Sequence, residues 1–172
     1  MINEKFKKIE PKGLKNNIFK LWDDEWFLIT AGNRNKFNCM TASWGGFGIL
    51  WNLPVSFIFI RPTRYTFTFL EKTKHFTLTT FYKKDRRILS YCGKVSGKEH
   101  DKIIETGLKP LFLSDDVILY EQIKMGIVCE KLYFEDLKEK NFLDKILLKN
   151  YPKKDYHRLY VGKIKEIYIR KK

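Results

Sequence analysis

The feature that most constrains the fold is an apolar strand set between two polar motifs. Residues 55–60 read Val-Ser-Phe-Ile-Phe-Ile and barely alternate, which is typical of a strand buried on both faces. Pro62 stops this strand because proline cannot donate to a β-ladder. Residues 38–46 precede it with small hydroxyl residues, an aromatic and two glycines. Such a strand must lie in a sheet whose two faces are both covered by other parts of the chain.

Strand patterns recur along the rest of the chain, and residues 32–36 form a turn between the first two strands. We expect strands at residues 26–31, 37–43, 55–60, 75–81, 117–121, 123–134 and 159–169. Helices are expected between strands, at residues 63–72, 96–106 and 134–148. Since strands outnumber helices, the pattern favours a closed antiparallel barrel with peripheral helices over a doubly wound sheet.

The helix starts rest on short local signals. Thr63 is a candidate N-cap for the first helix. Ser96 and Glu99 fit a capping box for the second, and Gly107 supplies its left-handed stop. The third helix rests only on apolar residues at near-helical spacing between residues 134 and 148.

Length and composition indicate a single domain over residues 1–172, with neither repeats nor a linker. The three cysteines lack the spacing of a disulfide framework or a zinc site, and the three histidines form no metal pattern. Cys129 is expected in the core, and Cys39 is interpreted as a packed thiol without a redox role. The sequence shows no secretory signal and no membrane-spanning apolar run, so a cytoplasmic protein is expected.

The formal net charge of +14 permits a nucleic-acid-binding protein as one alternative. The lysines are scattered, however, and no nucleic-acid-binding motif accompanies them. An anionic small ligand explains the two closely spaced arginines, Arg61 and Arg64, more economically.

Two motifs carry the most chemical information. In the first, Thr41 and Ser43 offer hydrogen bonds without bulk, and Ala42 lets a flat ring approach the backbone. Trp44 would either cover the pocket or pack on the bound ring. In the second, Arg61 and the neighbouring residues lie near an expected helix start and suit a phosphate group. A guanidinium forms bidentate hydrogen bonds with phosphate, and helix N-termini favour anions. The alternatives are a core strand with a glycine turn and a solvated arginine pair that caps a strand.

Two further segments are weaker signals. Ser96 and Gly97 with nearby lysines form a potential anion cradle, although an ordinary capped helix explains them equally well. Asp155 and His157 precede Gly162 in the last expected strand, where His157 is either a site residue or a lone surface histidine.

The pattern N-x-M-T-A-S-W-G, followed after an apolar strand by R-P-x-R-Y-T, closely resembles the flavin reductase-like family of FMN-binding split barrels, which includes the flavoredoxins. The Ser-Gly-x-x-x-Asp-Lys segment that ends at Lys102 and the Asp-x-His segment are similar to later parts of that family. Lys163 departs from the pattern, since the family commonly has an acidic residue after the glycine at this place.

The resemblance implies an antiparallel Greek-key split β-barrel, mainly β with peripheral helices, that binds FMN noncovalently. It also implies a homodimer, with NAD(P)H or a redox protein as electron donor and no side chain required for catalysis beyond a possible His157, because the flavin supplies the chemistry. An FMN-binding protein without turnover is the alternative of a different class. The residues expected to bind the cofactor are Asn38, Met40, Thr41, Ala42, Ser43, Trp44, Arg61, Arg64, Tyr65, Thr66, Ser96, Gly97 and Lys102.

Overall fold

The computed structural model describes residues 2–171, and its centre is one antiparallel sheet. The strand order is β3-β2-β6-β9-β10-β5-β4, and β1 pairs with the far end of β10. A short hairpin of β7 and β8 lies apart from it. The strands are β1 Phe6–Ile9, β2 Phe27–Gly32, β3 Phe37–Ala42, β4 Gly45–Leu50, β5 Leu53–Ile60, β6 His75–Thr80, β7 Pro110–Phe112, β8 Ile118–Tyr120, β9 Met125–Asp136 and β10 Arg158–Arg170.

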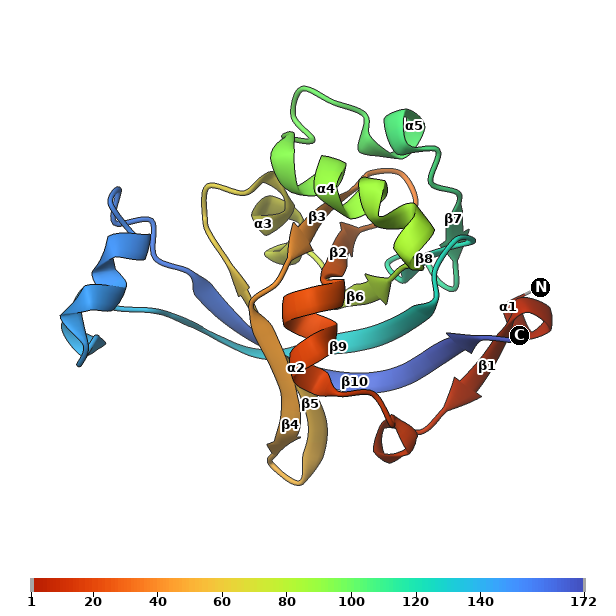
Figure 1. Ribbon diagram of the computed structural model, residues 1–172, viewed down its shortest axis with the longest axis horizontal. Helices are drawn as coiled ribbons and strands as arrows, with labels where there is room; N and C mark the ends of the chain where they lie inside the picture. Colours follow the sequence, from red (N-terminus) through yellow and green to blue (C-terminus); the bar gives the residue numbers. More distant parts are fainter. Residues whose placement is uncertain (1, 172) are drawn as a thin grey trace.

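The helices are short and lie at the periphery of the sheet (Figure 1). They are α1 Ile2–Lys5, α2 Ile18–Lys20, α3 Tyr65–Leu70, α4 Arg86–Lys94 and α5 Lys102–Thr106, with 3-10 turns η1 Pro11–Gly13, η3 Lys83–Asp85, η4 Glu139–Asn141 and η5 Lys145–Asn150 and the π-helical turn η2 Leu21–Glu25. No helix within residues 2–171 has the length and apolarity needed to span a bilayer.

The predicted split β-barrel with peripheral helices is confirmed. Among the described strands, the hydrogen-bonded path ends at β3 on one side and at β4 on the other, so the barrel stays open rather than closed. The predicted hairpin is also present, since Asn33 and Lys36 exchange backbone hydrogen bonds between β2 and β3.

The side chains on the two faces of β2 pack in two separate hydrophobic clusters. Phe27 and Ile29 pack with Leu78 and Ile127 in one cluster. Leu28, which points to the opposite face, packs in a second cluster that includes side chains of α4. Burial on both faces explains why this strand reads as an apolar run. β5 differs from its prediction, because Ile58 and Ile60 are buried whereas Phe57 and Phe59 are only partly buried. Cys129 is fully buried, as predicted.

The helix predicted at 63–72 is present as α3, but its N-cap residue is Arg64 rather than Thr63. The other two predicted helices differ more from the structure. The helix expected at 96–106 begins only at Lys102, because Asp101 rather than Ser96 caps it by accepting from the N–H groups of Ile103 and Ile104. The Ser96 hydroxyl accepts instead from the N–H of Lys98 inside a loop. Its predicted end is correct, since Gly107 is left-handed with φ of 69°.

The helix expected at 134–148 is absent from the described chain. β9 continues to Asp136, and η4 and η5 follow as 3-10 turns. Figure 1 shows this segment, between β9 and β10, as an arm extending away from the barrel. The sequence did not predict β1, β7, α1 or α2. It also missed β4, which begins at Gly45, and α4, whose buried residues are Ile88, Leu89 and Cys92.

Candidate functional site

The first motif lies at the end of β3, in the wall of a cavity of about 270 Å³ that we call the strand-end cavity. β3 is followed at once by β4, so Ser43 and Trp44 occupy the bend between two strands. The hydroxyl of Thr41 donates to the carbonyl of Leu89 at 2.5 Å, which attaches this strand end to α4. The residues that line the cavity are Met40, Thr41, Ala42, Ser43, Trp44, Phe59, Arg61, Arg64 and His157.

Arg61, at the end of β5, is held by the arm. One guanidinium nitrogen lies 2.9 Å from each carboxylate oxygen of Asp155, and the other donates to the carbonyl of Asn150 at 2.8 Å. The guanidinium also lies over the ring of Tyr151, 5.0 Å from its centroid. Arg61 lowers the pKa of the Asp155 carboxyl through this hydrogen-bonded pair. Its charge is therefore shared with an acid before any ligand arrives.

His157 closes the same cavity from the arm side. Its ring lies 5.1 Å from that of Trp44, centroid to centroid, and its Nδ1 is 2.8 Å from the hydroxyl of Tyr151. Burial, reinforced by the positive charge of Arg61, lowers the pKa of His157 from 6.5 to about 4. The imidazole at this site is therefore neutral at pH 7, and it is not a lone surface histidine.

A second cavity of about 110 Å³ adjoins the first, and we call it the loop cavity. It shares Met40 and Arg64 with the strand-end cavity. Its lining residues come from β3, the start of α3, the end of α4, the loop after α4 and the first residue of α5: Asn38, Met40, Thr63, Arg64, Tyr65, Thr66, Cys92, Lys94, Val95, Ser96, Gly97 and Lys102.

Arg64 differs from Arg61 in having no fixed partner. Within residues 2–171, no hydrogen bond or ion pair engages its guanidinium, and the residue is exposed. It is the N-cap residue of α3, and the first two residues of this helix, Tyr65 and Thr66, also line the loop cavity. An uncommitted guanidinium is suited to a phosphate group.

Lys102 lines the loop cavity but is almost completely buried. Only 5% of the residue is exposed, and its ammonium donates to the carbonyls of Cys39 and Cys92, each at 2.9 Å. Burial lowers the pKa of Lys102. The side chain ties β3 to α4 and adds positive potential from below.

Asn38 and Gly97 join the loop to β3. The Asn38 amide donates to the hydroxyl of Thr66 at 2.7 Å, which joins β3 to α3 and leaves the O–H of Thr66 as a donor. A Cβ placed on Gly97 would lie 1.9 Å from Oδ1 of Asn38, which only glycine avoids. The close approach explains Gly97 without requiring contact with a ligand.

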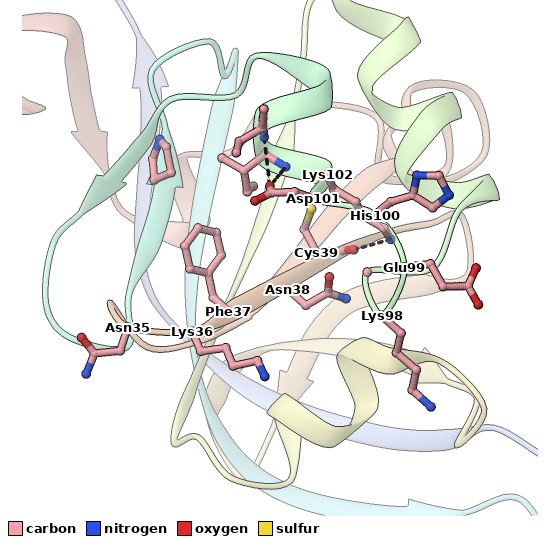
Figure 2. A pocket seen from close by; sticks show the side chains of 14 residues that line it. Asn35, Lys36, Phe37, Asn38, Cys39, Lys98, Glu99, His100, Asp101 and Lys102 are labelled. Carbon is pink, nitrogen blue, oxygen red and sulfur yellow. Dashed lines mark hydrogen bonds between the residues drawn. The ribbon is translucent and has the colours of Figure 1, made fainter.

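A third cavity of about 510 Å³, which we call the outer cavity, is lined by residues 35–39, residues 97–104 and Pro110. Figure 2 shows Asn38, Cys39 and Lys102 along one wall and Lys98, Glu99 and His100 along the loop. Asn38, Gly97 and Lys102 line both this cavity and the loop cavity.

The structure therefore brings all of the predicted cofactor residues, and His157, around two adjoining cavities. Sequence reasoning missed Phe59, Thr63, Cys92, Lys94 and Val95 as lining residues. Phe59 follows from strand alternation, because it lies two residues before Arg61. No sequence signal identifies the Arg61–Asp155 pair, which joins residues far apart in the chain.

No protein-family model matches this sequence, and no curated protein matches it. Solved structures do match. A flavoredoxin of Desulfovibrio vulgaris superimposes with a TM-score of 0.65 at 19% identity, over 91% of this chain and 74% of that chain. A flavoredoxin from Methanosarcina acetivorans gives 0.66 at 20% identity, over 95% and 75%.

An FMN-binding domain of a flavin reductase-like enzyme from Shewanella baltica gives a TM-score of 0.66 at 13% identity, over 95% of this chain and 76% of that chain. These likenesses define the class of fold: the chain has the split barrel of the flavoredoxins and flavin reductase-like proteins. The resemblance carried by its two motifs is thereby confirmed at the level of fold.

Proposed function

We propose that this protein binds FMN noncovalently across the strand-end and loop cavities and acts as a flavin-dependent oxidoreductase. The observation that carries the proposal is the position of Arg64, which has no partner among the described residues and lines both cavities. The fold agrees, since similar structures bear the names flavoredoxin and FMN-binding domain.

The residues fit the two ends of this cofactor. In the strand-end cavity, Thr41, Ala42 and Ser43 present small groups and backbone along one wall, and Trp44 and His157 supply aromatic faces. In the loop cavity, Arg64 and the first turn of α3 would hold the phosphate. Lys102 and Arg61 would support it by charge rather than by a dedicated contact.

Bound FMN would supply hydride acceptance and electron transfer, which the protein only has to orient. The protein's own groups would bind the ring, exclude water with Trp44, and keep a neutral imidazole at the rim. No step requires a charged acid or base from this wall. We propose NAD(P)H or a redox protein as the electron donor, and a flavin reductase or flavoredoxin-like carrier as the role.

The first experiment is an absorption spectrum of freshly purified protein, followed by anaerobic addition of NADH and then of NADPH. Flavin bands that bleach with a nicotinamide are expected for a reductase. Bands that persist with both nicotinamides but bleach with dithionite indicate a carrier fed by a protein, or an FMN-binding protein without turnover.

A colourless protein that also fails to bind added FMN would contradict the proposal. The basic charge would then direct attention to nucleic acid, tested by a salt-dependent gel shift. The Arg61→Ala/Arg64→Ala double variant tests the phosphate assignment separately. It is expected to lose FMN under dialysis conditions in which the unmodified protein retains it.

A further inference from the structure

Two buried thiols face each other beneath the proposed flavin site. Cys39 lies on β3 and Cys92 on α4, and their sulfur atoms are 3.8 Å apart. Each residue is only 1% exposed. The third cysteine, Cys129, lies in the other core cluster, so the pair stands alone among the described cysteines.

The pair lies in the wall between two cavities. Cys39 lines the outer cavity, and Figure 2 shows its sulfur beside Lys102. Cys92 lines the loop cavity. A small polar oxidant such as hydrogen peroxide would have to reach the sulfur atoms through these cavity walls, since each residue is only 1% exposed.

Lys102 holds the two cysteine backbones around one point. Its ammonium donates to the carbonyls of both residues, so β3 and α4 are joined where the thiols meet. A disulfide needs a sulfur–sulfur separation of about 2.0 Å. The two sulfur atoms, now 3.8 Å apart, therefore have to approach to about 2.0 Å, while Lys102 holds β3 and α4 together.

Charge and hydrogen bonding distinguish the two thiols. The hydrogen bond with Cys39 lowers the pKa of Cys92, and the nearby Lys102 ammonium lowers it further. The pKa of Cys39 is raised by the same hydrogen bond and by burial. Cys92 is thus the thiol that ionises first, and the thiolate is the form that reacts with peroxide.

The 3.8 Å contact replaces the sequence-based interpretation of Cys39 as a packed thiol without a redox role. We propose that Cys39 and Cys92 are a redox-active pair that hydrogen peroxide converts to a reversible disulfide. The Cys92 thiolate attacks one peroxide oxygen, the O–O bond breaks, and the other oxygen leaves as hydroxide, which a proton converts to water. Cys39 then attacks the sulfur of the Cys92 sulfenic acid, and the oxygen leaves as a second water. The two thiols lose two electrons in all, and the peroxide gains them.

The test uses the full-length protein and does not depend on bound FMN. Protein reduced with dithiothreitol is desalted, treated with hydrogen peroxide, denatured in an alkylating reagent and weighed by mass spectrometry. Two of the three thiols are expected to escape alkylation after peroxide, and dithiothreitol is expected to restore both. A proteolytic digest should contain the Cys39 peptide joined to the Cys92 peptide.

Cys129→Ser is the matched control, because Cys129 is fully buried and burial raises its pKa to about 12. This variant should still lose both remaining thiols to the disulfide. Cys92→Ser should yield no cross-link. If the Cys92→Ser variant fails to fold, the presence or absence of the joined Cys39 and Cys92 peptides in the digest of the unmodified protein decides whether the disulfide forms. Three alkylated thiols after peroxide, or added oxygen atoms without a joined peptide, would overturn the proposal.

Discussion

Arg61 and Arg64 are three residues apart in the sequence, yet their surroundings differ. Arg61 is fixed by Asp155, the Asn150 carbonyl and the Tyr151 ring. Arg64 has no such partner within residues 2–171 and lines both cavities. Arg61 therefore stabilises the fold, while the guanidinium of Arg64 is available to bind a ligand.

Replacing Arg64 with alanine should weaken FMN binding roughly 10- to 100-fold, since a charge-assisted hydrogen bond contributes about 1.5–3 kcal/mol. The free energy of unfolding should change by less than about 0.5 kcal/mol. Fluorescence titration with FMN and urea unfolding measure the two quantities.

Arg61→Ala is the matched variant. It should lower the free energy of unfolding by about 1–3 kcal/mol, because it leaves Asp155 and a carbonyl without their donor. If Arg64→Ala proves to be the destabilising change and leaves FMN affinity intact, the assignment of the two roles is wrong.

His157 should make stability depend on pH. Its pKa is about 4 in the folded protein and 6.5 without the fold, so the unfolded chain binds more protons between these values. Stability is therefore fully present above pH 6.5 and falls as the pH drops toward 4, by at most about 3 kcal/mol. His157→Gln cannot titrate and should show a smaller loss over this interval. Equal slopes for the two proteins in urea unfolding at several pH values would refute this.

At the scale of elements, Lys102 joins α5 to both β3 and α4 through its bonds to the Cys39 and Cys92 carbonyls. Lys102→Met keeps the apolar stem but leaves two buried carbonyls without a donor. We expect it to lower the free energy of unfolding by roughly 2 kcal/mol. Lys98→Met, at an exposed position of the adjacent loop, should have little effect in the same denaturant titration.

The sequence predicted the strands well because each has a local signal. β2, β3, β5, β6 and β10 consist of β-forming residues bounded by turns or proline, and their ends fall within a few residues of prediction. The helix predicted at residues 134–148 is wrong for a physical reason. Its apolar residues have nearly helical spacing, but Leu143 is 97% exposed and Ile146 is 63% exposed. No core packs against the apolar face that such a helix would have.

The capping box at Ser96 misled for a similar reason. A serine hydroxyl that accepts from a nearby N–H serves a turn as well as a helix, and Asp101 competes successfully for the cap. The candidate site was nevertheless predicted from its motifs, since both lie at strand ends. The pairing of Arg61 with Asp155 was not predictable, because it depends on how the arm returns to the barrel.

At the scale of the whole molecule, apolar side chains are exposed near the base of the arm. Leu132, Tyr133 and Phe134 on β9 are 41%, 45% and 49% exposed, and the ring of Trp51 lies 6.1 Å from that of Tyr133. Because successive strand residues point to opposite faces, Tyr133 and Trp51 form an exposed aromatic pair on one face, and a second copy that covers this pair would agree with the predicted homodimer.

Light scattering after size-exclusion chromatography should accordingly give twice the mass of the chain. Tyr133→Glu should shift the protein toward monomer, because a carboxylate resists burial in an apolar interface. Ile104→Glu, at an exposed position on α5, should remain dimeric. A monomer at micromolar concentration for the unmodified protein would rule out the dimer.

The long strand β10 has a consequence for folding. It pairs with β9 along one edge, and with β5 and then β1 along the other. In the described sheet, the β4–β5 hairpin reaches the remaining strands only through β10. Because the order of synthesis places residues 158–170 after every strand they join, a nascent chain holds two unconnected pieces of sheet until these residues emerge. Pairing of β10 with β5, which lies far before it in the sequence, closes a long loop, and we expect this step to set the folding rate. The protein should therefore fold slowly for its size.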